Sequence, residues 1–90
     1  MNKAIITVVG QDTVGIIARV CTYLSERKVN VLDISQTIID GFFNMMMIVD
    51  VTEVKDDFGG MVNELEALGD EIGVRIRCQK EEIFTKMHRI

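Results

Sequence analysis

The residues best suited to bind a ligand lie in a short segment bracketed by two glycines. The run from Val9 to Ile16 reads Val-Gly-Gln-Asp-Thr-Val-Gly-Ile and joins an apolar segment to an amphipathic one. Gly10 and Gly15 permit close approach of the backbone, and the first amides of a following helix lack intrahelical acceptors. A carboxylate could be held there, with Asp12 as an acceptor for a cation. The spacing alone favours a simpler explanation, in which Gly10 turns the chain and Gly15 allows close packing.

A second polar group stands at the start of the next expected strand, which we expect to lie beside the first strand. Asn30, Asp33 and Gln36 carry hydrogen-bonding side chains within this short segment. Each also has a purely structural explanation. Asn30 suits a left-handed turn after a helix, whereas Asp33 and Gln36 could satisfy a bulge or a subunit contact.

Other arrangements of reactive side chains do not indicate catalysis or metal binding. Cys21 and Cys78 are far apart in the sequence and have no neighbouring Cys or His. We therefore expect both to behave as small buried hydrophobic side chains. His88 has no Ser, Cys or acid in a triad arrangement. An acylphosphatase-like hydrolase would need Arg19 and Asn30 as its arginine and asparagine, but Arg19 falls a full turn inside a predicted helix, away from the loop amides. We therefore expect no catalytic residue, no metal and no cofactor.

Charge and composition exclude further classes of partner. The net charge is −4, from 14 acidic and 10 basic residues without a basic cluster, so the field repels nucleic acid. An RNA-recognition module would also need an aromatic residue on the first strand, which has none. Neither a signal peptide nor a membrane-spanning run is recognisable, and we expect a cytoplasmic protein that does not enter a membrane. Ninety residues with 48% hydrophobic content suffice for one domain, 1–90.

The hydrophobic pattern predicts four strands and two helices. Gly10 is expected to end a first strand that is buried on both faces, and Asp12 or Thr13 to cap the first helix. Asp40-Gly41 predicts a hairpin turn, and Gly69 is expected to end the second helix. The predicted elements are strand 3–9, a helix with Val14, Ile17, Ala18, Cys21 and Leu24 as its apolar stripe, strands 30–40 and 42–52, a helix opening at Asp56 or Asp57 with Phe58, Met61, Val62, Leu65 and Leu68 as its stripe, and an edge strand 73–80.

The order β-α-β-β-α-β predicts the ferredoxin-like α+β fold, a four-stranded antiparallel sheet with two helices on one face. Strand 42–52 is apolar on both sides, yet helices on one face of the sheet can cover only one of them. Residues 81–90 are expected to form a short helical extension that covers part of the other face. A second subunit would cover the remainder, which predicts a homodimer. The apolar side of the extension would consist of Ile83, Phe84, Met87 and Ile90.

The run 6–16 followed by 30–36 resembles the signature of ACT domains, which are regulatory amino-acid-binding modules. Along all of its length, 1–90, the chain resembles a family of stand-alone bacterial and archaeal ACT-domain proteins. The resemblance implies a βαββαβ fold, association between units, and small effectors, often amino acids, bound where units meet. Thr13 departs from the family, since many members carry proline there, and the loop should be less rigid as a result.

The resemblance also implies which residues hold the effector. In ligand-binding members the loop glycine contacts the ligand through its backbone, and the residue that begins strand two contacts it from the partner. The implied function is a homodimeric regulatory module, not an enzyme, that acts on a separate enzyme or regulator. A ligand-free protein-interaction module is the main alternative, and an acylphosphatase-like hydrolase is another. The implied ligand-binding residues are Gly10, Asp12, Gly15, Ile16, Asn30, Asp33 and Gln36.

Overall fold

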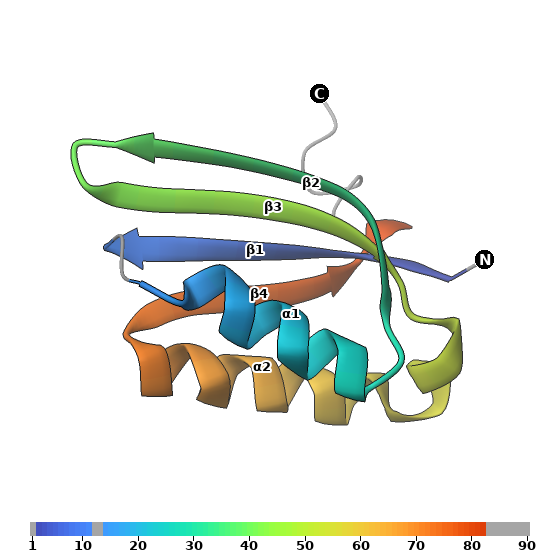
Figure 1. Cartoon of the computed structure of the whole chain (residues 1–90). Coiled ribbons are helices and arrows are strands. Elements are labelled where there is room, and N and C mark those ends of the chain that lie inside the picture. Colours follow the sequence, from blue (N-terminus) through green and yellow to red (C-terminus); the bar gives the residue numbers. More distant parts are fainter. Residues whose placement is uncertain (1, 12–13, 83–90) are drawn as a thin grey trace.

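The computed structural model describes residues 2–11 and 14–82, which form one four-stranded sheet with two helices packed on one of its faces (Figure 1). This arrangement confirms the predicted ferredoxin-like βαββαβ fold. The predicted helical extension lies outside the described residues from 83 onward. The elements are β1 (Lys3–Gln11), α1 (Ile16–Glu26), β2 (Asn30–Ile39), β3 (Phe42–Asp50), a 3₁₀ segment η1 (Thr52–Asp57), α2 (Phe58–Ile72) and β4 (Val74–Lys80).

The strand order is β2-β3-β1-β4, and all three pairings are antiparallel. The expectation that the second strand lies beside the first is wrong. The hairpin keeps β2 beside β3, and β1 pairs with the other edge of β3, so β2 becomes an edge strand. The predicted turn is confirmed, because Asp40 and Gly41 both have positive φ angles, 52° and 78°.

The first strand differs from its prediction in two ways. Gly10 does not end β1, because it pairs with Phe43 of β3 and with Val74 of β4. Nor is β1 buried on both faces along its whole length: on the side that the helices do not cover, Ile5 is buried but Val9 is exposed. The apolar alternation of β1 therefore reflects one core face and one outer face.

The apolar stripe of α1 also differs from the predicted one. The helix begins at Ile16, directly after Gly15 in a left-handed conformation. Its buried residues are Ile16, Val20 and Leu24, which follow one another at intervals of four. Val14 precedes the helix and is exposed, as is Ile17 within it. The prediction placed the stripe in the wrong phase because it began the helix too early.

The second helix continues past its predicted end. Gly69 lies inside α2 and is buried, and a Cβ atom there would approach the carbonyl oxygen of Val74 to 2.7 Å. The helix ends instead at Gly73, which has a φ of 82°. Met61 and Leu65 are buried as predicted. Gly69 thus allows α2 to pack closely on β4.

The core lies between the helices and one face of the sheet. Alternate residues of each strand point toward the helices, and cross-strand partners share a face. The opposite face, termed the outer face below, has no helix over it among the described residues (Figure 1). The sheet contributes to the core Ala4, Ile6 and Val8 from β1, Phe43, Met45, Met47 and Val49 from β3, and Val74, Ile76 and Cys78 from β4.

Candidate functional site

The predicted ligand loop ends at the N-terminus of α1, with open space around the missing Cβ of Gly15. Gly15 is the N-cap of α1 with φ 90°, and no atom lies within 4 Å of the position that a Cβ would occupy. The carbonyl of Gly15 accepts a hydrogen bond from the amide of Arg19. The side chain of Ile16 is buried in the core, so Ile16 could contact a ligand only through its backbone. Asp12 lies outside the described residues.

Gly10 has a clear packing role. A Cβ at this position would approach Cγ1 of Val74 to 2.8 Å, which is closer than real Cβ atoms come to other atoms. The absence of a side chain at Gly10 is therefore required by the contact between β1 and β4. This contact accounts for Gly10 without any ligand, but the simpler explanation of the sequence was wrong in detail, because it gave Gly10 a turn and assigned close packing to Gly15.

The three polar residues of β2 are all exposed but point in different directions. Asn30 begins the strand opposite Asp50 of β3. Asp33 follows an irregularity in the β2–β3 register, and its Oδ1 accepts a hydrogen bond from the amide of Ile34 at 2.8 Å. The register places Asp33 on the outer face and Gln36, opposite the core residue Met45, on the helix-facing side. An open hollow of about 460 Å³ beside Asn30 is lined by Ser25 and Lys28.

Within one chain, the loop and the start of β2 lie at opposite ends of the sheet. Asn30 shares a row with Asp50 and with Lys3, the first residue of β1. Gly15 follows the last residue of β1, Gln11, by a few positions. Because β1 has nine residues at about 3.3 Å each, Asn30 and Gly15 of the same chain cannot contact one ligand together.

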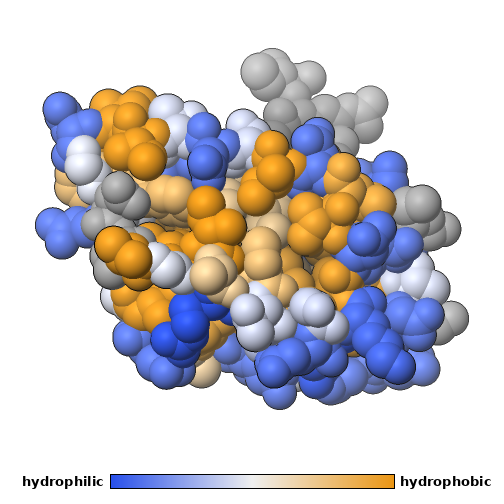
Figure 2. Space-filling model, in the orientation of Figure 1, coloured by the Kyte–Doolittle hydropathy of each residue, from blue (hydrophilic) through white to orange (hydrophobic). Residues whose placement is uncertain are grey.

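The edge strand β2 leaves apolar side chains exposed on both faces of the sheet. Ile34 and Ile38 are 44% and 54% exposed although they share the helix-facing side with core residues of β3. Ile39 and Phe42 are exposed on the outer face. Figure 2 shows apolar surface along β2 and β3 above α1, whereas the helices below it are largely hydrophilic. The helices therefore do not extend far enough to cover β2.

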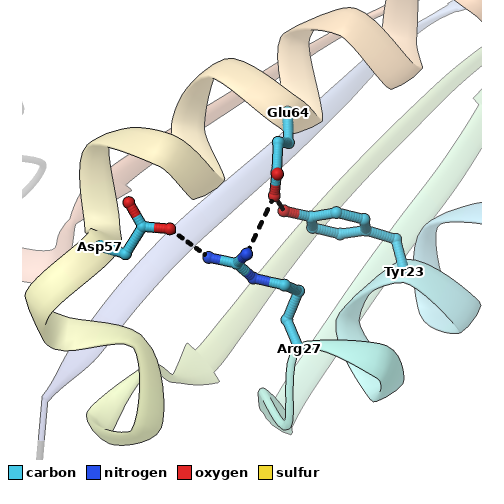
Figure 3. A network of polar contacts seen from close by, with 4 residues as sticks. All are labelled: Tyr23, Arg27, Asp57 and Glu64. Atoms are coloured by element: carbon cyan, nitrogen blue, oxygen red, sulfur yellow. Dashed lines mark hydrogen bonds and ion pairs between the residues drawn. The ribbon is translucent and has the colours of Figure 1, made fainter.

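The sequence analysis missed a polar network that joins the two helices (Figure 3). Tyr23 of α1 donates a hydrogen bond to Glu64 of α2. Arg27 forms ion pairs with Glu64 at 3.3 Å and with Asp57 at 2.9 Å. Partial burial and the hydrogen bond to Glu64 raise the pKa of Tyr23 above its usual value. The i, i+4 spacing of Tyr23 and Arg27 was the available signal, since it places both on one side of a helix.

Cys78 and Arg19 are reactive side chains whose surroundings the structure describes. Cys78 is buried, and burial raises its pKa to about 12. Arg19, in the first turn of α1, forms an ion pair with Glu71 of α2 at 2.8 Å. Within residues 2–11 and 14–82, no three His, Cys, Asp or Glu side chains gather to hold a metal ion. His88 lies outside the described residues.

The family follows from the comparison with known proteins. A family model described as ACT domain matches residues 2–79. This chain belongs to the ACT-domain family. A UPF0237 protein from Bifidobacterium longum is 82% identical to it over 90 residues, and one from Methanocaldococcus jannaschii is 47% identical over 90 residues, each alignment covering 100% of both chains.

Solved ACT-domain structures show the same fold. An ACT domain protein from Streptococcus pneumoniae is 47% identical, with a TM-score of 0.82 over 92% of this chain and 93% of that one. The regulatory subunit of aspartate kinase from Thermus thermophilus is 29% identical, with a TM-score of 0.67 over 88% of this chain and 51% of that subunit. The ACT domain indicates a regulatory module rather than a catalytic one. In the described part of the chain, each helix is too short or too polar to span a bilayer.

Proposed function

We propose that this ACT domain is a homodimeric regulatory module that binds a small zwitterionic effector, an amino acid, at the subunit interface. Its output would pass to a separate enzyme or regulator in the cytoplasm. The observation that carries the proposal is the distance between Gly15 and Asn30. They lie at opposite ends of one sheet, so an effector that contacts both requires two chains.

The free edge of β2 is the edge that suits self-association. Two β2 strands that pair antiparallel around a two-fold axis would bring the start of one strand beside the end of the other, which is the end where the loop lies. The exposed Ile34 and Ile38 would then be buried beside their counterparts. The opposite edge is less suitable, because antiparallel β4 strands would set Arg75 and Arg77 against the same arginines of the partner.

The two ends of an amino acid match the groups at this interface. Gly15 and the amides that open α1 offer donors and space for an α-carboxylate. Asn30 of the partner offers an acceptor for the α-ammonium, and Asp12 is a second acceptor in the loop. Gly10 and Ile16 would contribute to the site only through their backbone. Asp33 and Gln36 are secondary candidates for contacts with the effector.

The decisive experiment measures dimerisation and effector binding in the same preparation. Sedimentation should show self-association of the wild-type chain, and Ile34→Lys should weaken it by placing like charges across the paired edges. Thermal-shift screening against the standard amino acids should find a ligand that raises the melting temperature. Calorimetry of that ligand should show that Asn30→Ala weakens binding by roughly 1–3 kcal/mol.

Gly15→Ala tests the loop, and Gly73→Ala is its matched control. Both glycines have φ near +85° and open space around the missing Cβ, so both substitutions introduce similar backbone strain. Only Gly15→Ala should reduce effector binding. If the wild-type protein binds no amino acid at millimolar concentration, the effector proposal fails, and the exposed apolar surface of β2 then favours a ligand-free interaction module.

A further inference from the structure

The free edge of β4 borders a hollow that carries charges of both signs. The hollow has a volume of about 550 Å³ and extends along β4 beside the last turns of α2. Among the described residues, none of its four charged side chains makes an ion pair or a side-chain hydrogen bond. These four side chains are all exposed, and they belong to Glu66 and Asp70 of α2 and to Arg75 and Arg77 of β4.

The two acidic residues lie on the flank of α2 that faces away from α1. Glu64 and Glu71 form ion pairs with arginines of α1, so they identify the flank that faces α1. Glu66 follows Glu64 by two positions, which is about 200° around the helix, and Asp70 lies about one turn further along the same flank. Because α2 runs along β4 (Figure 1), this flank borders the free edge of the strand.

The two arginines lie on the other side of the same edge. Val74, Ile76 and Cys78 point into the core, so the alternate residues Arg75 and Arg77 project from the outer face. β1 occupies one edge of β4, and no described strand occupies the other. The backbone groups along this edge are therefore open to a further strand, with positive charge on one side and negative charge on the other.

An extended peptide beside β4 would match both sides of this edge. Its side chains would point alternately to the outer face, beside the arginines, and toward the helices, beside the carboxylates. Residues two apart in a strand, such as Arg75 and Arg77, are separated by about 6.6 Å. Residues four apart in a helix, such as Glu66 and Asp70, are separated by about 6 Å along the axis. Both charged pairs therefore have nearly the spacing of alternate residues in a strand.

A second copy of β4 does not have the pattern that this edge requires. Its outer side chains include the same arginines, and its helix-facing side chains are mainly apolar. The edge therefore suits a different chain, whose outward side chains are acidic and whose helix-facing side chains are basic.

We propose that the free edge of β4 is a docking surface for an extended segment of another protein in which acidic and basic side chains alternate. The acidic side chains would lie beside Arg75 and Arg77, and the basic ones beside Glu66 and Asp70. Main-chain hydrogen bonds to β4 would add the segment to the sheet. This docking surface depends neither on an effector nor on pairing of the β2 edges.

A blocked peptide of about ten residues, with Glu and Lys in alternation, tests the docking surface when titrated up to about 1 mM into the full-length chain. NMR should show shifts of the backbone amide signals from Val74 to Arg77, and the titration gives the dissociation constant. A peptide of the same composition, with Glu in one half and Lys in the other, should bind about tenfold more weakly or less well still.

Charge reversal identifies the side chains that read the peptide. Arg77→Glu and Asp70→Arg should each weaken binding about fivefold or more. Lys3→Glu is the matched control, because it makes the same change of charge on the outer face of β1. Lys3 lies four residues from Thr7, the partner of Arg77, which is about 13 Å and beyond the Debye length of about 10 Å. Binding by Lys3→Glu should stay within about twofold of wild type.

Exchange of all four charges should restore binding of the alternating peptide, because a shift by one residue turns its acidic side chains to the other side. The variant combines Glu66→Arg, Asp70→Arg, Arg75→Glu and Arg77→Glu, and thermal melting verifies that it is folded. Equal binding of the two peptides by the wild-type chain, or shifts confined to residues outside β4, would overturn the proposal. The four charges would then serve only to keep other strands from pairing with this edge.

Discussion

The phenolic hydroxyl of Tyr23 donates a hydrogen bond to Oε1 of Glu64, which joins α1 to α2 (Figure 3). This hydrogen bond holds the phenol in its neutral form, since a phenolate could not donate it. Partial burial acts in the same direction and is the larger cause of the raised pKa of Tyr23. The stability of the helix pair should therefore depend on the protonation of this one side chain.

Tyr23 should ionise well above the usual tyrosine pKa of about 10. A group whose pKa is raised by folding contributes stability that is complete below the unfolded pKa, and this stability is lost as the pH rises toward the folded pKa. The free energy of unfolding should thus fall above about pH 10, and it should fall less steeply in the Tyr23→Phe variant. Tyr23 is the only tyrosine of the chain, so tyrosinate absorbance reports it directly. Titration of the native protein at the same pH as the urea-unfolded chain would contradict this prediction.

Arg27→Ala should lower the free energy of unfolding by about 1 kcal/mol, because it removes ion pairs to both Asp57 and Glu64. Arg19→Ala is the matched control on the same helix. Arg19 has one ion-pair partner, Glu71, and both of these side chains are about half exposed or more, so its loss should be below about 0.5 kcal/mol. Urea denaturation of the two variants measures the difference. Equal losses would show that the second carboxylate contributes nothing.

Alanine should have opposite effects at two glycines of α2. Gly69→Ala should destabilise the fold by roughly 1–3 kcal/mol, because its Cβ would approach the carbonyl oxygen of Val74 to 2.7 Å. A Cβ atom at Gly59 would meet only open space, so Gly59→Ala should stabilise the helix by up to about 1 kcal/mol. Thermal or urea unfolding checks both. A neutral Gly69→Ala would mean that α2 and β4 separate without a significant loss of free energy.

Alkylation should distinguish the two cysteines. Cys78 is buried and has a pKa of about 12, so little reactive thiolate is present near pH 8. Cys21 is half-buried on α1 and should react with iodoacetamide first. Mass spectrometry of native Cys21→Ser should show no labelling, and urea should expose Cys78 to the reagent. Equal labelling of both thiols in the native protein would contradict the burial of Cys78.

The fold was predictable because its signals are local and agree with one another. Asp40-Gly41 identifies the hairpin, and the alternation of Val74, Ile76 and Cys78 with polar residues identifies the edge strand. The phase of α1 was not predictable from apolar spacing, since Ile16 and Ile17 are equally apolar. The choice between them depends on the left-handed conformation of Gly15, which places Ile16 first in the helix.

The roles of the candidate site residues were harder to assign, because they depend on contacts distant in sequence. Gly10 resembles a loop glycine in the sequence, but its neighbour Val74 lies at the other end of the chain and gives it a packing role. The network around Arg27 was missed for the same reason. Its partners, Asp57 and Glu64, become neighbours only when α1 and α2 lie on the same face of the sheet.

The central position of β1 imposes an order on folding during synthesis. β1 is synthesised before the other three strands, yet both of its neighbours, β3 and β4, are made later. The hairpin of β2 and β3 is the first strand pairing that the growing chain can complete, and it needs only a short loop to close. β1 must remain unpaired until β3 emerges, and its other edge stays open until β4 is synthesised. Among the four strands, β1, with its apolar residues from Ala4 to Val8, thus waits longest after its synthesis for its pairing to be completed.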